Sequence, residues 1–283
     1  MSRDMLVHLL LHSAFPLACL GHLDQAWSRV DSALKEARGL SDPFTLAFAL
    51  GIACLAGWFV RLEPKPLLPY ADELLALTTE HGIGHFRLLA FILRGWCLAV
   101  SGHAEEGIPL LTTGLTGMEE DGFMAWRPCH LAHLGDSCRI AGWWQAALGH
   151  LAEAQRLAEE TEERCFQAET LRLRGDLLLT TGDSAAAEVS YHEALAIARQ
   201  QSAKLWELRA ATSLARLWRD QGKRLEARDL LTPVYGWFTE GFGTPVLQEA
   251  KALLEDLANA PALPANGISH AYGQQTHNDG GSR

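Results

Sequence analysis

The chain has 283 residues, of which 48% are hydrophobic, and its 34 acidic residues against 24 basic ones give a net charge of −10. This length suits one or two compact domains or one extended array of repeats. With this excess of acidic residues the electrostatic field of the chain does not attract nucleic acid or anionic lipid, so neither is expected as a direct partner. No apolar run reaches the roughly 18 to 20 residues of a membrane span, and the first residues lack a signal-peptide cleavage region, so we expect a cytoplasmic protein.

Pairs of small residues twelve positions apart recur along the chain. The pairs, in chain order, are Ala14 with Ala26, Gly95 with Gly107, Gly135 with Ala147, Gly175 with Ala187, and Ala215 with Ala227. A glycine follows each first member by seven positions, namely Gly21, Gly102, Gly142, Gly182 and Gly222. A weaker copy fits around Cys54 and Pro66. The spacing of about 40 residues predicts six units, at about 1–40, 41–81, 82–122, 123–162, 163–202 and 203–242.

Each unit is predicted to be a hairpin of two antiparallel helices. The paired small residues let the two backbones approach closely, and the glycine between them supplies the positive φ that ends the first helix. In the unit at 163–202, Asp183 or Ser184 is the expected N-cap of the second helix. One hairpin cannot bury its apolar face alone, so the units must stack. We therefore predict an all-α, right-handed superhelical solenoid.

The last part of the chain is expected to close this array. Thr244 and Pro245 are suited to the N-cap and first turn of a capping helix at 245–258. Four aromatic residues just before it are expected to pack this helix onto the last hairpin: Tyr235, Trp237, Phe238 and Phe242. The segment 259–283 has few large apolar residues and many turn formers, so we expect a disordered tail.

The repeat resembles the tetratricopeptide family, whose small-residue pair is followed by a further small residue, here Ala33, Gly114, Ala154 and Ala194. It departs from that family in its period, about 40 rather than 34, and in lacking the usual helix-ending proline. The stretches SLARLWRDQG (213–222) and YGWFTEGF (235–242) resemble the C-terminal end of large bacterial signalling proteins. In these proteins a class III adenylate or guanylate cyclase domain, or another regulatory head, precedes a signal-transduction ATPase. The resemblance implies a regulatory repeat region.

The chemistry of a cyclase or an ATPase is not found in this chain. The stretch GHAEEGIP (102–109) has the two glycines of a phosphate-binding loop, but Ile108 stands where the lysine is required. Cys129, His130 and His133 could share a helix face and a metal ion, but the sequence offers no fourth ligand nearby. We therefore expect neither enzymatic activity nor a metal ion or cofactor.

Candidate partner-binding residues lie on the first helix of each hairpin, which lines the concave side of a solenoid. The N-terminal half of this groove is apolar and the C-terminal half is charged, with candidates Phe15, Phe48, Trp58, Ile92 and Trp96, then Arg139, Arg172, Asp176, Arg209, Arg216 and Arg219. In one interpretation the groove takes an apolar segment first and a carboxylate-bearing element at the arginines. In the other, Phe48, Trp58 and Trp96 are inter-helix core, and the arginines pair with acidic neighbours at Glu169, Asp176, Glu207 and Asp220.

Two functions are consistent with these features. The first is a non-catalytic protein-interaction or regulatory module of a signalling ATPase or adenylate cyclase type protein, here without the catalytic domains. Its partner would be a protein or a peptide, with an ATPase or cyclase domain as one candidate. The second is a stand-alone ligand- or peptide-binding regulator of a transcription factor or an ATPase encoded elsewhere. The sequence does not predict an oligomeric state.

Overall fold

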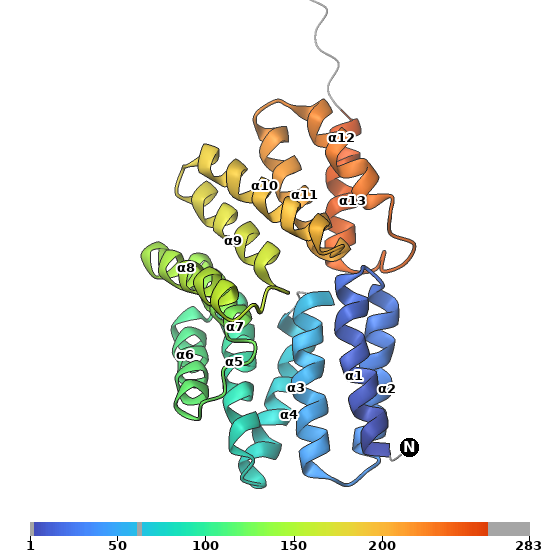
Figure 1. Cartoon of the computed structure of the whole chain (residues 1–283), viewed down its shortest axis with the longest axis vertical. Coiled ribbons are helices and arrows are strands. Elements are labelled where there is room, and N and C mark those ends of the chain that lie inside the picture. Colours follow the sequence, from blue (N-terminus) through green and yellow to red (C-terminus); the bar gives the residue numbers. More distant parts are fainter. Residues whose placement is uncertain (1–2, 61–63, 260–283) are drawn as a thin grey trace, which may run out of the picture.

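In a computed structural model of the chain, residues 3–60 and 64–259 are described, and they form thirteen α-helices and no strand (Figure 1). The predicted tail beyond Asn259 lies outside these residues. The helices are α1 (Arg3–Cys19), α2 (Leu23–Arg38), α3 (Pro43–Val60), α4 (Pro64–Glu80), α5 (Gly84–Val100), α6 (Ala104–Glu120), α7 (Arg127–Ile140), α8 (Trp144–Glu160), α9 (Gln167–Thr180), α10 (Ser184–Gln200), α11 (Lys204–Asp220), α12 (Arg224–Tyr235) and α13 (Pro245–Ala258).

Consecutive helices pair into hairpins, and the first helix of each hairpin also contacts the first helix of the next one, as in α1 and α3 or α9 and α11. This arrangement confirms the all-α solenoid. The small residues explain the close helix packing. A Cβ placed on Gly95 would lie 2.5 Å from the Leu111 backbone nitrogen and 2.6 Å from the Gly107 carbonyl oxygen. The helices α5 and α6 are therefore in backbone contact, which a larger side chain would prevent.

The turns between paired helices follow the predicted glycines. All five predicted turn glycines have φ between 78° and 95°, in the left-handed region: Gly21, Gly102, Gly142, Gly182 and Gly222. In the turn after α9, the Asp183 carboxylate accepts a hydrogen bond of 3.0 Å from the Ala186 backbone N–H, so Asp183 is the N-cap of α10. The stretch 102–109, which has the two glycines of a phosphate-binding loop, is the turn between α5 and α6 and the start of α6. Ile108 is buried in α6.

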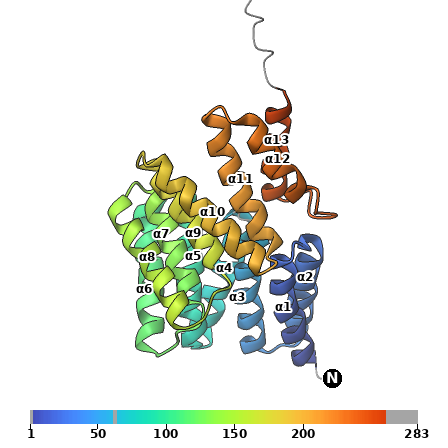
Figure 2. The same ribbon diagram turned by 45° about the horizontal axis from the view of Figure 1, so that its top comes forward.

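The superhelix turns far enough to bring its two ends together (Figures 1 and 2). Helix α1 contacts α11, and the loop between α12 and α13 lies on the turn after α1. The Gly241 backbone N–H donates to the Asp24 carboxylate at 2.9 Å. The Gln25 backbone and side-chain N–H groups donate to the Glu240 carboxylate at 3.2 and 3.1 Å. The first and last hairpins are thereby joined across more than 200 positions of sequence.

Aromatic residues of the loop between α12 and α13 make contacts that the sequence does not predict. Trp237 and Phe238 contact the turn at Gly21 of the first hairpin, where a Cβ would lie 2.8 Å from each ring. Phe242 is 49% exposed, and its ring centroid lies 6.1 Å from that of Tyr235. The expectation that these side chains pack α13 onto the last hairpin is therefore incomplete, because two of them close the superhelix instead.

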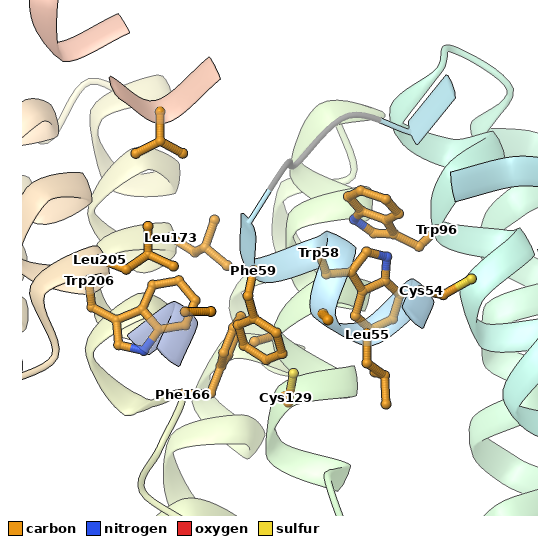
Figure 3. Close-up of a cluster of buried hydrophobic side chains, with 14 of the residues drawn as sticks. Cys54, Leu55, Trp58, Phe59, Trp96, Cys129, Phe166, Leu173, Leu205 and Trp206 are labelled. Atoms are coloured by element: carbon orange, nitrogen blue, oxygen red, sulfur yellow. The ribbon is translucent and has the colours of Figure 1, made fainter. Parts of the chain in front are cut away.

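The interior of the closed superhelix is filled by aromatic side chains from distant hairpins (Figure 3). Phe59 of α3 lies with its ring centroid 5.4 Å from that of Trp206 of α11 and 5.5 Å from that of Phe166. Phe15 of α1 packs edge-on against Phe59 at 4.6 Å. The apolar core is thus continuous from the first unit to the last.

Two glycine substitutions should measure how much the joined ends contribute to stability. Gly182→Ala places a Cβ in open space at φ 93°. We therefore expect the free energy of unfolding to fall by about 1–2 kcal/mol, because alanine is strained in the left-handed region. Gly21→Ala has a similar φ of 89°, but its Cβ meets Trp237 and Phe238, so we expect a further loss of about 1–3 kcal/mol. Urea unfolding followed by circular dichroism measures both. Equal losses would mean that the two ends do not touch in solution.

Candidate partner-binding surface

The apolar half of the predicted groove is mostly closed. Trp58, Ile92 and Trp96 are 1%, 0% and 4% exposed, and the indoles of Trp58 and Trp96 pack edge-on with centroids 5.3 Å apart (Figure 3). In this conformation these three side chains belong to the core, as the second interpretation of the sequence has it for Trp58 and Trp96. A contribution to partner binding would require them to become exposed.

The other two aromatic candidates are half-buried. Phe15 packs against Trp126 at 5.0 Å as well as against Phe59. Phe48 stacks on His8 with ring centroids 4.2 Å apart and meets Phe86 at 6.2 Å. The curvature of the superhelix explains this packing, because side chains on the inner faces of the first helices approach one another as the solenoid closes.

The charged half is organised around Arg172 of α9, which is 8% exposed. Its guanidinium donates to both oxygens of Glu169, at 2.7 and 2.9 Å, and to Asp176 at 2.5 Å. The Tyr191 hydroxyl donates to the other oxygen of Asp176 at 2.8 Å. Although burial opposes the charge, the carboxylates of Asp176 and Glu169 hold the pKa of Arg172 well above its usual range. Arg172 is therefore a fully engaged structural cation.

Arg209 of α11 shares the same acidic partner. It lies 3.0 Å from the Glu169 carboxylate, and burial together with the nearby Arg172 cation lowers its pKa. Arg139 pairs with Asp136 at 2.7 Å, one repeat earlier. Of the acidic neighbours that the sequence suggests, Glu169, Asp176 and Asp220 are used in this way, with Asp220 paired to Arg219 at 2.8 Å. Glu207 instead pairs with Arg199 and Lys204.

A cleft of about 60 Å³ opens beside this network, between α9, α11 and α13. Its lining is rich in cationic and hydroxyl groups: Arg172, Arg209, Thr212, Ser213, Arg216, Val246 and Glu249. One water molecule takes up about 30 Å³ of the liquid, so the cleft has room for a single carboxylate group or about two waters. The sequence-predicted residues Arg172, Arg209 and Arg216 are brought together here, whereas Arg139 does not line the cleft.

The outer edge of the cleft is the part that a partner can reach. The Arg216 side chain is 38% exposed and forms an ion pair with Glu249 of α13, whose side chain is 57% exposed. Arg219, one turn further along α11, pairs with Asp256 of α13 at 3.3 Å. The capping helix therefore presents its own carboxylates to the arginines of α11. Exposed pairs of this kind contribute only about 0–1 kcal/mol each, so they can be exchanged for another carboxylate.

Sequence reasoning missed Glu249 and Ser213 as lining residues, whereas Thr212 stands at a groove position of the repeat register, three residues before Ala215. Ser213 follows Thr212 on α11, so the repeat register could have found it as well. No local signal marks Glu249, because its approach to Arg216 depends on how α13 packs across α11.

The histidines considered as metal ligands lie in the core. His130 and His133 are 2% and 5% exposed, and burial lowers the pKa of both to about 3. His133 Nδ1 donates to the Cys129 carbonyl oxygen at 2.7 Å, and its ring stacks on Trp58 at 4.0 Å. Among the described residues, no group of three or more His, Cys, Asp or Glu side chains could hold a metal ion. Nor does any described helix meet the length and hydropathy needed to cross a membrane.

Comparisons with known proteins show the fold. No protein-family model matches the chain, and no curated protein matches it in sequence. Among solved structures, the apo form of RapI is similar with a TM-score of 0.61 and 12% identity, over 90% of this chain and 86% of that one. A Rap protein complexed with Competence and Sporulation Factor is similar with a TM-score of 0.60 and 14% identity, over 91% and 76% of the two chains.

A third neighbour is Aspartyl phosphate phosphatase F from Bacillus subtilis, with a TM-score of 0.58 and 9% identity. It is matched over 87% of this chain and 62% of its own length. At these identities the likeness is one of fold. The chain is thus similar to these proteins in being a helical-repeat solenoid.

Proposed function

We propose that the chain is a non-catalytic protein-interaction and regulatory module that binds a carboxylate-bearing segment of a protein or peptide at the α9–α11–α13 cleft. The observation that carries this proposal is the cleft itself, in which Arg172, Arg209 and Arg216 surround a space the size of one carboxylate. Guanidinium groups bind carboxylates through paired, charge-assisted hydrogen bonds. Thr212 and Ser213 of α11 line the same cleft.

The capping helix supports this assignment from within the molecule. Glu249 already places a carboxylate on Arg216, so the cleft is compatible with that group and geometry. Arg172 and Arg209 are held by buried partners and shape the site, while Arg216 is the cation that can change partner at little cost. A bound segment would then compete with Glu249 for Arg216.

The fold neighbours supply context for a regulatory role, because one of them is a Rap protein complexed with Competence and Sporulation Factor. Within this proposal, the sequence resemblance favours an ATPase or cyclase domain as the partner, in a bacterial signalling protein. The alternative is a stand-alone ligand- or peptide-binding regulator that acts on a transcription factor or an ATPase encoded elsewhere. The identity of the captured partner separates the two.

The test is affinity capture from native lysate with partner identification by mass spectrometry, using the wild-type chain, Arg216→Glu and Arg228→Glu. Arg228 is exposed on α12, and its guanidinium lies 3.9 Å from the carboxylate of its neighbour Asp229. The substitution Arg228→Glu therefore changes the net charge by the same amount as Arg216→Glu but lies outside the cleft. We expect a partner that is kept by wild type and by Arg228→Glu and is reduced at least tenfold by Arg216→Glu.

Circular dichroism must show that all three proteins are equally helical. Arg172→Glu is not a suitable variant, because reversing a buried, paired cation costs several kcal/mol and would unfold the site. Capture of an ATPase or a cyclase would favour the first function, and capture of a transcription factor would favour the alternative. A partner set that Arg216→Glu leaves unchanged would contradict the cleft as the binding site.

A further inference from the structure

A second surface, separate from the arginine cleft, lies where the turn after α5 meets the turn after α7. It contains two adjacent tryptophans, Trp143 and Trp144, which are 43% and 50% exposed. Ile140 and Leu148, on either side of the same turn, are 44% and 41% exposed. Neither indole makes a ring contact or a side-chain hydrogen bond within residues 3–60 and 64–259.

The internal repeat shows that the turn itself does not require these tryptophans. The position of Trp143 is occupied in four other hairpins by polar residues, namely His22, His103, Asp183 and Lys223. Those turns close in the same way, with a positive-φ glycine just before the N-cap position. The Trp143 backbone N–H makes the turn hydrogen bond to the Cys138 carbonyl at 2.8 Å, which needs no particular side chain. The two indoles are therefore available for a role outside the turn.

Beside Trp143 there is a groove of about 480 Å³ between the two turns. Small residues line part of it, and Ile140 and Trp143 form an apolar wall. The groove is also lined by the first turn of α6, with Glu105 and Glu106. Glu106 is paired with Arg94 at 3.3 Å, and Glu105 has no ion-pair partner among the described residues. An apolar wall thus shares the groove with exposed carboxylates.

We propose that this groove, lined by Ile140, Trp143, Glu105 and Glu106 and flanked by Trp144, docks a protein segment that carries an apolar side chain next to a lysine or arginine. The apolar side chain would cover the wall of Ile140 and Trp143, which removes exposed indole from water. The cation would pair with Glu105 and lie against an indole face, where cations are attracted to the ring. The same carboxylates repel anionic lipid and nucleic acid, so a cationic protein segment is the matching partner.

The experiment uses the full chain and a fluorescently labelled 14-residue amphipathic peptide of leucine and lysine, with a leucine and glutamate peptide of the same pattern as the control probe. Binding is measured by fluorescence anisotropy. Trp143→Ser/Trp144→Ser keeps the net charge, so it separates docking from attraction by the acidic chain as a whole. Glu105→Gln/Glu106→Gln tests the carboxylates, and Val189→Ser/Leu225→Ser removes apolar side chains that are 58% and 59% exposed elsewhere.

We expect saturable binding of the lysine peptide, weakened at least tenfold by the tryptophan pair and at least threefold by the glutamine pair. Val189→Ser/Leu225→Ser should stay within twofold of wild type. The inference is overturned if the glutamate peptide binds as tightly, or if the tryptophan pair binds the lysine peptide like wild type. Sedimentation velocity on the same proteins provides a further check. A wild-type dimer that the tryptophan substitutions dissolve would assign the surface to a second copy of the chain and also overturn the inference.

Discussion

Lowering the pH from 8 to 5 is expected to destabilise the fold by about 2 kcal/mol for each of His130 and His133. Burial lowers the pKa of both imidazoles to about 3, whereas the unfolded chain takes up protons near 6.5. Below 6.5 the unfolded state binds protons that the folded state does not. The contribution of the two neutral imidazoles to the free energy of unfolding is therefore fully present above pH 6.5, and it is lost progressively as the pH falls toward 3.

Urea unfolding at several pH values measures this effect, and His133→Phe provides the control. Phenylalanine retains a ring between Trp58 and Phe166, which lie 4.0 and 5.0 Å from the imidazole, but it cannot bind a proton. The variant should lose close to half of the slope that His130 and His133 together contribute between pH 6.5 and 5. A slope identical to that of wild type would show that His133 is accessible to protons in the folded protein.

Gly95→Ala is expected to lower the free energy of unfolding by about 2–4 kcal/mol, a large effect for one added methyl group. The new Cβ would lie within 2.6 Å of backbone atoms of α6, and backbone atoms cannot move aside as a flexible side chain can. The helices α5 and α6 would have to separate, which opens the core between them. Chemical unfolding followed by circular dichroism gives the difference.

Gly149→Ala is the matched substitution for this comparison. Gly149 lies within α8, and a Cβ there meets nothing within 4 Å. Replacing a helical glycine with alanine on an open face should stabilise the chain by about 0.5–1 kcal/mol. The opposite signs of the two changes test the hairpin packing. Similar effects at Gly95 and Gly149 would rule out backbone contact between α5 and α6.

The local features of the fold could be predicted from the sequence because each depends on residues near in the chain. The paired small residues predict close helix packing, and a turn glycine with its following N-cap, such as Gly182 with Asp183, predicts where one helix ends and the next begins. The i,i+3 and i,i+4 spacing of Glu169, Arg172 and Asp176 likewise predicts their pairing on one face of α9.

The closed shape could not be predicted in the same way. The curvature of a solenoid accumulates from a small rotation at each repeat, which no local pattern specifies. The contact between Gln25 and Glu240 and the packing of Phe59 on Trp206 depend on that accumulated rotation. The sequence leaves open whether Trp58 and Trp96 line a groove or belong to the core, and the packing of α3, α5 and α7 buries both. Glu249 reaches Arg216 through a non-local contact as well.

Photo-crosslinking in cells of the native host tests whether a partner binds at the α9–α11–α13 cleft. A benzophenone amino acid replaces Glu249 at the rim of the cleft, whose side chain is 57% exposed, or Leu225, which is 59% exposed elsewhere on the last hairpin. We expect a specific partner to be crosslinked from position 249 and not from position 225. No product from position 249, or the same products from both positions, would contradict it.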